Sequence, residues 1–68
     1  MKAVSGKQMC RILKRHGWQH VRTRGAHFTF EKPASTSFTV PVHGNQTLKT
    51  GIQHAIMKAA GLTEEDLR

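Results

Sequence analysis

The sequence predicts an α+β fold with the element order α-β-β-β-α, in which two helices cover one face of a three-stranded antiparallel sheet. Two observations predict it. A segment near each end of the chain carries apolar residues at helical spacing. Between them, two segments alternate apolar and polar residues as half-buried strands do, and breaks rich in Gly, Pro and Ser separate the strands. Because the chain has only 68 residues, we expect one domain over residues 1–68.

The first helix is predicted over residues 6–16. Ser5 followed three residues later by Gln8 is the pattern of a capping box, and Gly17 is a natural C-terminal stop. Residues at helical spacing form an apolar face that we expect to pack against the sheet. His16 continues this face and is therefore expected at the edge of the core. The face comprises Met9, Ile12, Leu13 and His16.

The first strand is predicted over residues 18–23, although its side chains do not alternate cleanly. Trp18 and Val21 have opposite parity, so they cannot share one face of a regular strand. A β-bulge or a later start of the strand would each explain this, and the sequence leaves both explanations open. For the same reason it leaves the orientation of His20 undecided.

The second and third strands are predicted over residues 27–32 and 38–43, after a turn that Gly25 allows. Both strands place Phe or Val at alternate positions, so one face of this hairpin is apolar. Pro41 has no backbone N–H group, and we therefore expect the third strand to lie at an edge of the sheet. The opposite face of the second strand comprises His27, Thr29 and Glu31.

The connection between these strands sets a specific register. A five-residue connection over residues 33–37 pairs Phe28 with Val42 and keeps the apolar positions on one face. The same register places His27 opposite His43 on the face away from the helices. A slip of two residues would preserve the burial but separate the two histidines, so the pairing is a hypothesis.

The second helix is predicted to begin at Thr50, with Gln53 completing a second capping box, and to end at Gly61. His54 falls on its outer face and is expected to be solvated. Thr63 is positioned to cap a final short turn that carries most of the acidic residues. The expected apolar stripe of the helix comprises Ile52, Ala55, Ile56 and Ala59.

The charge is strongly positive, with a formal net value of +7 at pH 7. Three of the four acids lie at residues 64–66, so residues 1–63 contain ten of the eleven Lys and Arg residues and only Glu31 as an acid. Such a body attracts polyanions, which favours nucleic acid as the partner. A basic adaptor for an acidic protein is the competing interpretation, and the two partners can coexist.

The remaining composition bounds the setting. A single cysteine, Cys10, forms no intramolecular disulfide and suits a reducing compartment. No apolar run approaches the roughly 20 residues of a membrane span, and the N-terminus lacks the apolar stretch of a signal peptide. We therefore expect a cytoplasmic protein with no membrane partner. Neither metal-ligand spacing nor a phosphate-binding glycine loop is present, so no metal and no small-molecule cofactor is expected.

Histidines on an uncovered sheet face of a basic protein point to acid–base chemistry on RNA. RNA carries its own nucleophile, the 2′-hydroxyl, and a histidine can accept or donate a proton near neutral pH. A histidine on the surface of a strand is more often simply solvated. This pattern alone therefore does not single out a catalytic residue.

An ordered set of residues resembles the HicA toxin family over about residues 5 to 62. The resemblance implies a fold like that of a double-stranded-RNA-binding domain, ribosome-independent cleavage of mRNA, and neutralisation by a HicB-type antitoxin. The histidine of the family's Gly-Ser-His motif corresponds to His27, whereas Ala26 stands where the family usually has Ser. The residues that carry the resemblance are Gly17-Trp18, Arg22, Gly25-Ala26-His27-Phe28, Thr39-Val40-Pro41-Val42-His43, Leu48-Lys49-Thr50-Gly51-Ile52 and Ala60-Gly61-Leu62.

On this resemblance we expect a toxin of the stress response that acts as a metal-independent endoribonuclease, or mRNA interferase. His27 is the expected catalytic residue, and His43 is the candidate for a second acid–base group. Arg22 and Arg24 are expected to hold phosphate oxygens. The alternative is a non-catalytic module that binds double-stranded RNA. Such modules commonly cluster lysines at the start of the second helix, where this chain has only Lys49. Further sequence-independent RNA contacts are expected from Lys7, Arg11, Lys14 and Lys49.

Overall fold

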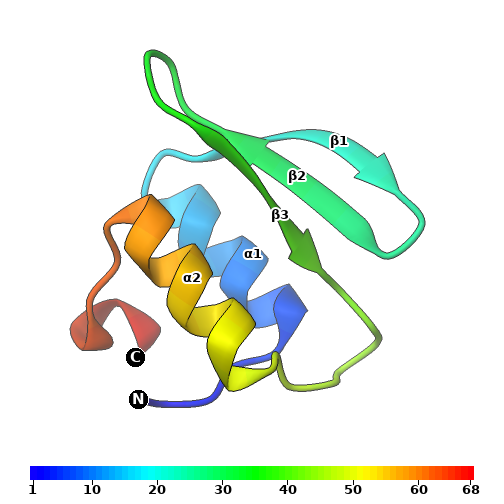
Figure 1. The fold of residues 1–68 in the computed structure, drawn as a ribbon, viewed down its shortest axis with the longest axis vertical. Coiled ribbons are helices and arrows are strands. Elements are labelled where there is room, and N and C mark those ends of the chain that lie inside the picture. Colours follow the sequence, from blue (N-terminus) through cyan, green and yellow to red (C-terminus); the bar gives the residue numbers. More distant parts are fainter.

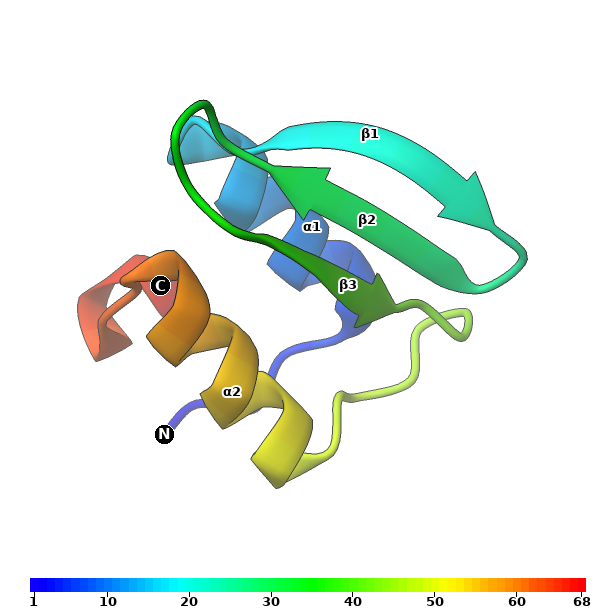
Figure 2. The ribbon, with the colours of Figure 1, turned by 45° about the horizontal axis from the view of Figure 1, so that its top comes forward.

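The computed structural model describes all of residues 1–68 and has the predicted order of elements. The three strands form one antiparallel sheet in the order β1-β2-β3, and both helices lie on the same side of it (Figure 1, Figure 2). The predicted α+β class is therefore confirmed. Neither helix combines the length and the apolar composition that crossing a bilayer would require. The elements are α1 (Gly6–Arg15), β1 (Gln19–Arg24), β2 (His27–Glu31), β3 (Ser37–Pro41), α2 (Thr50–Ala60) and the 3₁₀ turn η1 (Glu64–Leu67).

Helix α1 begins and ends as its local sequence predicts. The Gln8 backbone N–H donates to the Ser5 hydroxyl at 3.1 Å, and the Gln8 side chain accepts a hydrogen bond from the Ser5 N–H at 2.8 Å. Gly17 has φ +88° just after the helix, a conformation that favours glycine. The helix contributes Met9, Ile12 and Leu13 to the core.

The prediction that His16 packs at the edge of the core is wrong. Its side chain is 39% exposed, and its Nε2 lies 3.3 Å from Asp66 Oδ1. His16 is the C-cap residue of α1, so it follows the last turn of the helix rather than forming part of it. The turn η1 packs against α1 and brings an acid to this position. His16 therefore contacts Asp66 at the surface instead of packing in the core.

Strand β1 contains both features that the sequence left open. It begins at Gln19, after the buried Trp18, and the pairing with β2 jumps from His20 to Arg22. Val21 is the extra residue of this β-bulge and is 45% exposed. The bulge reverses the parity of the rest of the strand. It thereby turns Arg22 and Arg24 to the face away from the helices.

The predicted register between β2 and β3 is wrong by two residues. Phe28 pairs with Val40, and His27 pairs with Pro41 rather than with His43. The cause is the start of the turn, because the connection runs over residues 32–36 instead of 33–37. The turn is closed by the Ser35 N–H, which donates to the Lys32 carbonyl at 3.0 Å, and Ala34 takes a positive φ of 60°. The Lys32 amine lies 5.1 Å from the centre of the Trp18 ring, as a cation–π contact.

Helix α2 differs from the prediction in its cap and in its buried face. Lys49 is the N-cap, without a side-chain bond, and Thr50 is the first helical residue. Gln53 does not complete a capping box: its side chain is buried, accepts a hydrogen bond from the Val4 N–H and donates one to the Lys2 carbonyl. Of the expected stripe only Ile56 is buried. Because Gln53 faces inward, Ile52, Ala55 and Ala59 are exposed. The residues that α2 buries are Gln53, Ile56 and Met57.

The two ends of the chain meet beside the helices (Figure 1). The N-terminal ammonium lies 3.4 Å from Glu64 of η1. As predicted, Thr63 caps this turn: the Asp66 carboxylate accepts hydrogen bonds from the Thr63 N–H and hydroxyl. Leu67 is 3% exposed and joins the core. The C-terminal turn is therefore anchored to the same core as the sheet.

Candidate functional site

The outer face of the sheet brings together the arginines and the histidine that the sequence singled out. Arg24 pairs with His27, and Arg22 pairs with Thr29. In the β2–β3 register Thr29 lies opposite Thr39, and their hydroxyl oxygens are 3.4 Å apart. Residues paired across neighbouring strands point to the same face. All five side chains therefore lie on the face that the helices leave uncovered.

His27 occupies the first position of β2, directly after the two-residue turn Gly25–Ala26. Gly25 has φ +54° at the first of these two positions, a requirement of the tight turns that join hairpin strands. The Ala26 carbonyl accepts a hydrogen bond of 2.7 Å from the Val42 N–H, just beyond β3. The position before His27 thus contributes a backbone contact. Alanine makes this contact as well as any other residue.

The charge around His27 is positive. Arg24 is its cross-strand neighbour and Arg22 lies one pair further along β1, both exposed to solvent. The only acid of the sheet, Glu31, lies at the opposite end of β2. Guanidinium groups bind phosphate oxygens through two parallel hydrogen bonds. This end of the face can therefore hold a phosphate beside an imidazole that accepts or donates a proton.

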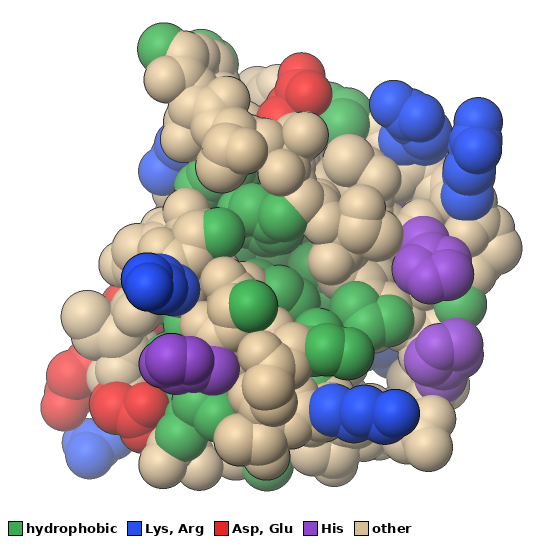
Figure 3. Space-filling view, viewed as in Figure 1, with side chains coloured by type: hydrophobic (Ala, Val, Ile, Leu, Met, Phe, Trp, Pro, Cys, Tyr) green, Lys and Arg blue, Asp and Glu red, His purple; other side chains and the backbone are tan.

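His43 is not the cross-strand partner of His27 and lines a pocket at the edge of the sheet. The pocket has a volume of about 220 Å³ and lies between the end of β3 and the start of α2. Lys49, another predicted RNA-binding residue, lines it as well. Figure 3 shows apolar side chains between α2 and the strands, with histidine, Lys and Arg side chains along the right-hand edge. The pocket is lined by Pro41, His43, Gln46, Thr47, Leu48, Lys49 and Ile52.

The three predicted RNA-binding residues of α1 lie together on its exposed side. Lys7, Arg11 and Lys14 line one groove with Phe28 and Val42, at the end of the sheet near the β1–β2 turn. Lys7 and Arg11 also line a polar recess of about 420 Å³ beside the loop before α2. The structure thus gathers these cations into one surface. That surface is separate from the one formed by Arg22 and Arg24.

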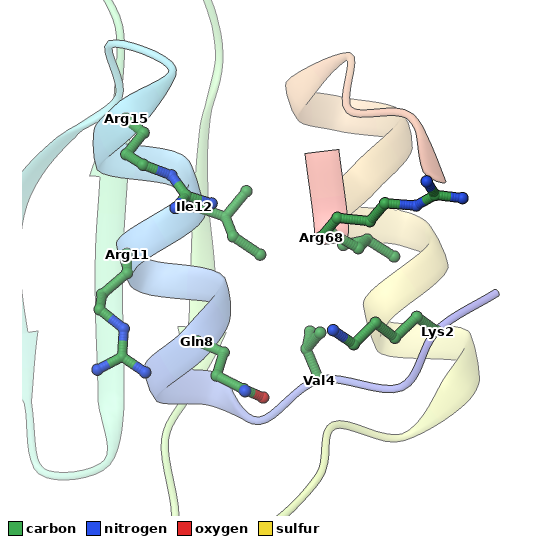
Figure 4. Close-up of a pocket in the computed structure, with 8 residues that line it drawn as sticks. Lys2, Val4, Gln8, Arg11, Ile12, Arg15 and Arg68 are labelled. Carbon is green, nitrogen blue, oxygen red and sulfur yellow. The ribbon is translucent and has the colours of Figure 1, made fainter. Parts of the chain in front are cut away.

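A further cationic recess was missed by the sequence analysis (Figure 4). Arg11 and Arg15 border it from α1, and Lys2 and Arg68 border it from the two chain ends. The two residues from α1 are one helical turn apart, a signal that was available in the sequence. The contribution of the chain ends was not, because it depends on how they meet. Its volume is about 180 Å³, and it is also lined by Val4, Gln8, Ile12 and Leu67.

The structure settles the orientation of His20, which faces the helix side of the sheet. Its ring stacks on Phe28 at a centroid distance of 5.0 Å. Its Nε2 lies 3.0 Å from the Arg22 carbonyl oxygen and 2.6 Å from the Thr23 hydroxyl oxygen. His20, which precedes the bulge, is thus tied to the two residues that follow it. It helps to hold the backbone that presents the arginines.

Cys10 does not have the environment of a nucleophile. Its side chain is buried in the core. Burial raises the pKa of the Cys10 thiol, and nearby Lys14 opposes this only in part. The thiolate, which is the reactive form, is therefore disfavoured at neutral pH. Cys10 therefore contributes to the core rather than to a reactive site.

The comparison with known families agrees with the geometry. Residues 6–62 match a family model described as the HicA toxin of bacterial toxin–antitoxin systems. No curated protein matches the sequence. The matched region includes the outer face of the sheet and the pocket at its edge. It excludes Lys2 and Arg68, which border the recess of Figure 4.

Proposed function

Because the chain belongs to the HicA toxin family of bacterial toxin–antitoxin systems, we propose that it is a metal-independent endoribonuclease that cleaves mRNA without the ribosome, with His27 as its catalytic residue. The observation that carries this proposal is the juxtaposition of His27 with Arg24 and Arg22 on the uncovered face of the sheet. This juxtaposition depends on the bulge in β1, which interrupts the regular pairing of β1 with β2.

The reaction uses the 2′-hydroxyl of the RNA as the nucleophile. Its oxygen attacks the adjacent phosphorus, a 2′,3′-cyclic phosphate forms, and the bond to the 5′-oxygen of the next nucleotide breaks. His27 acts either as the base that removes the 2′-hydroxyl proton or as the acid that protonates the leaving oxygen. Arg22 and Arg24 stabilise the charge that develops on the phosphate oxygens. The other proton is exchanged with water.

The cations outside the sheet face bind the RNA backbone in this proposal. Lys7, Arg11 and Lys14 attract phosphates irrespective of sequence, and Lys49 does so beside the pocket. The protein partner is an antitoxin of the HicB type, which neutralises the toxin by covering the cationic surface. Because the substrate is mRNA, the toxin acts in the cytoplasm.

The test is cleavage of a long RNA in EDTA by the wild type, by His27→Ala and by His54→Ala. His54 is an exposed histidine on α2 and serves as the matched control. The wild type and His54→Ala should cut the RNA. His27→Ala should bind it with little loss but cut it about 10²- to 10⁴-fold more slowly, the usual contribution of an acid–base residue.

Two results would contradict the proposal in different ways. Cleavage by His27→Ala at the wild-type rate would remove His27 from the chemistry. Intact RNA with all three proteins, together with a salt-sensitive mobility shift, would indicate the non-catalytic RNA-binding module instead.

A further inference from the structure

We propose that the pocket between β3 and α2 binds one unpaired nucleobase of the substrate beside the scissile phosphate, and that His43 stacks on this base. The proposal rests on the proposed function, because it takes the substrate to be single-stranded RNA. It gives His43 a role in recognition and makes the pocket a determinant of where the RNA is cut.

The pocket adjoins the catalytic position directly. Pro41 is the cross-strand partner of His27 and also lines the pocket. The Val42 N–H donates to the Ala26 carbonyl at 2.7 Å, which holds the segment after β3 against the turn before His27. Cross-strand partners such as His27 and Pro41 have Cβ atoms roughly 4.5–5.5 Å apart. A nucleotide whose phosphate lies at His27 therefore has its neighbouring base within reach of the pocket.

The lining of the pocket offers groups for the face and the edge of a base and for a phosphate. Pro41 and Ile52 offer apolar contacts, and the imidazole of His43 offers a flat surface on which a base can stack. Gln46 brings both a donor and an acceptor for the polar edge of a base. Lys49 supplies a positive charge for a phosphate. No acidic residue lines the pocket.

The polar groups of the pocket are free to bind a ligand. The side chains of His43, Gln46 and Lys49 take part in none of the hydrogen bonds or ion pairs within the chain. The backbone beneath them is fixed: the Gln46 N–H donates to the His43 carbonyl, and the Leu48 N–H donates to the Val4 carbonyl. Backbone hydrogen bonds thus hold the pocket in place, whereas the donors and acceptors of these three side chains have no partner within the chain. This arrangement suits recognition of a small polar ring better than packing of the fold.

The register explains why this role suits His43 better than acid–base catalysis. A histidine opposite His27 would share the same phosphate, as the sequence suggested. The observed register places Pro41 there instead, which has no ionisable group. His43 lies two residues beyond the end of β3, where it lines the pocket.

The test combines cut-site mapping with a binding measurement that does not depend on cleavage. Random-sequence RNA is cleaved by the wild type, His43→Ala, His43→Phe and Gln46→Ala, and the product ends are sequenced. Gln46→Ala should flatten the base preference at one position beside the cut. His43→Ala should raise KM by about 5- to 150-fold, the range measured for loss of one stacked base. His43→Phe should recover this binding and keep the pH dependence of kcat. Gln19→Ala, an exposed glutamine on β1, is the matched control.

The binding arm uses the His27→Ala background with fluorescently labelled eight-nucleotide probes of A, C, G or U. Discrimination among the four probes that is lost with Gln46→Ala or His43→Ala supports the base pocket, even if the wild type cuts no RNA and the proposed function fails. Equal affinity for all probes and no effect of either variant overturns the pocket, even if the wild type cleaves. A kcat that collapses in both His43→Phe and His43→Ala returns His43 to acid–base chemistry and also overturns it.

Discussion

Replacing Gln53 with alanine should lower the free energy of unfolding by about 2–5 kcal/mol. The Gln53 side chain is 1% exposed and bridges α2 to the N-terminal arm. Its loss leaves the buried Val4 N–H without an acceptor, at about 1–3 kcal/mol, and removes a bond to the Lys2 carbonyl worth about 0.5–1.5 kcal/mol. The one buried methylene group that alanine lacks adds about 0.8 kcal/mol. A chain of 68 residues has a total stability of about 3–10 kcal/mol.

The assay is urea unfolding followed by the fluorescence of Trp18, the single tryptophan, which is 4% exposed. Gln53→Leu keeps most of the volume and should lose only the hydrogen-bonding part. Gln46→Ala, an exposed glutamine in a loop, should stay within about 0.5 kcal/mol of the wild type. A Gln53→Ala protein as stable as Gln46→Ala would refute the reasoning, because the arm would then not be held by this side chain.

Three further predictions concern the helix ends and the charges. Gly6→Ala should destabilise the protein by about 1–3 kcal/mol, because a Cβ there would lie 2.3 Å from the Pro41 carbonyl oxygen. In Gly51→Ala the new Cβ meets no atom within 4 Å, so this variant should be more stable than the wild type by up to about 1 kcal/mol. Thermal melts that give the two variants equal stability would contradict this prediction. The hydrogen bond from the Thr63 N–H holds the pKa of the Asp66 carboxyl below its ordinary value of 3.8. The stabilisation by the ionised carboxylate is therefore present above pH 4 and is lost as the pH falls through the lowered pKa. Hydrogen exchange should show that Asp66→Asn weakens the C-terminal turn at pH 7 but not at strongly acidic pH. Arg11→Gln should reduce the slope of log affinity for single-stranded RNA against log salt by about 0.7, and an unchanged slope would remove Arg11 from the RNA interface.

Features that depend on neighbours within a few residues were predictable from the sequence. The capping box of Ser5 and Gln8, the positive φ of Gly17 and the capped turn at Thr63 are all of this kind. The order of the elements and the apolar face of the hairpin follow from periodicity in the same way. In each case the energetic competition is local, so the sequence alone contains the relevant terms.

Features that depend on distant partners were not predictable. The buried face of α2 is set by Gln53, whose partners Val4 and Lys2 lie about fifty positions earlier in the chain. Helical periodicity assigned this face by hydrophobicity and therefore preferred Ile52 and Ala55. The register of β2 and β3 was decided by whether the turn begins at Lys32 or one residue later. Both registers bury the same phenylalanines, so hydrophobic patterning could not distinguish them.

The candidate site shows both kinds of dependence. His27 was placed on the uncovered face by simple alternation, and the structure agrees. The positions of Arg22 and Arg24 depend on the bulge at Val21, which the sequence left undecided. Without the bulge, Arg22 and Arg24 would both face the helices, and the outer face would lose both guanidinium groups. The bulge is thus the feature that turns a basic hairpin into a site.

The placement of the few acids explains why the net charge acts where His27 lies. The three C-terminal acids pair with groups close to them: Glu64 with the N-terminus, Glu65 with Arg68 and Asp66 with His16. The turn that carries these acids lies across the molecule from the β1–β2 turn (Figure 1). The longest extent of the molecule is 28 Å, whereas the Debye length at physiological salt is roughly 8 Å. Their charges are therefore both offset locally and screened before they reach His27. A chain of the same net charge with acids on β2 would attract phosphate less to this face, so the location of the acids, more than the net charge, makes this face favourable for an anion.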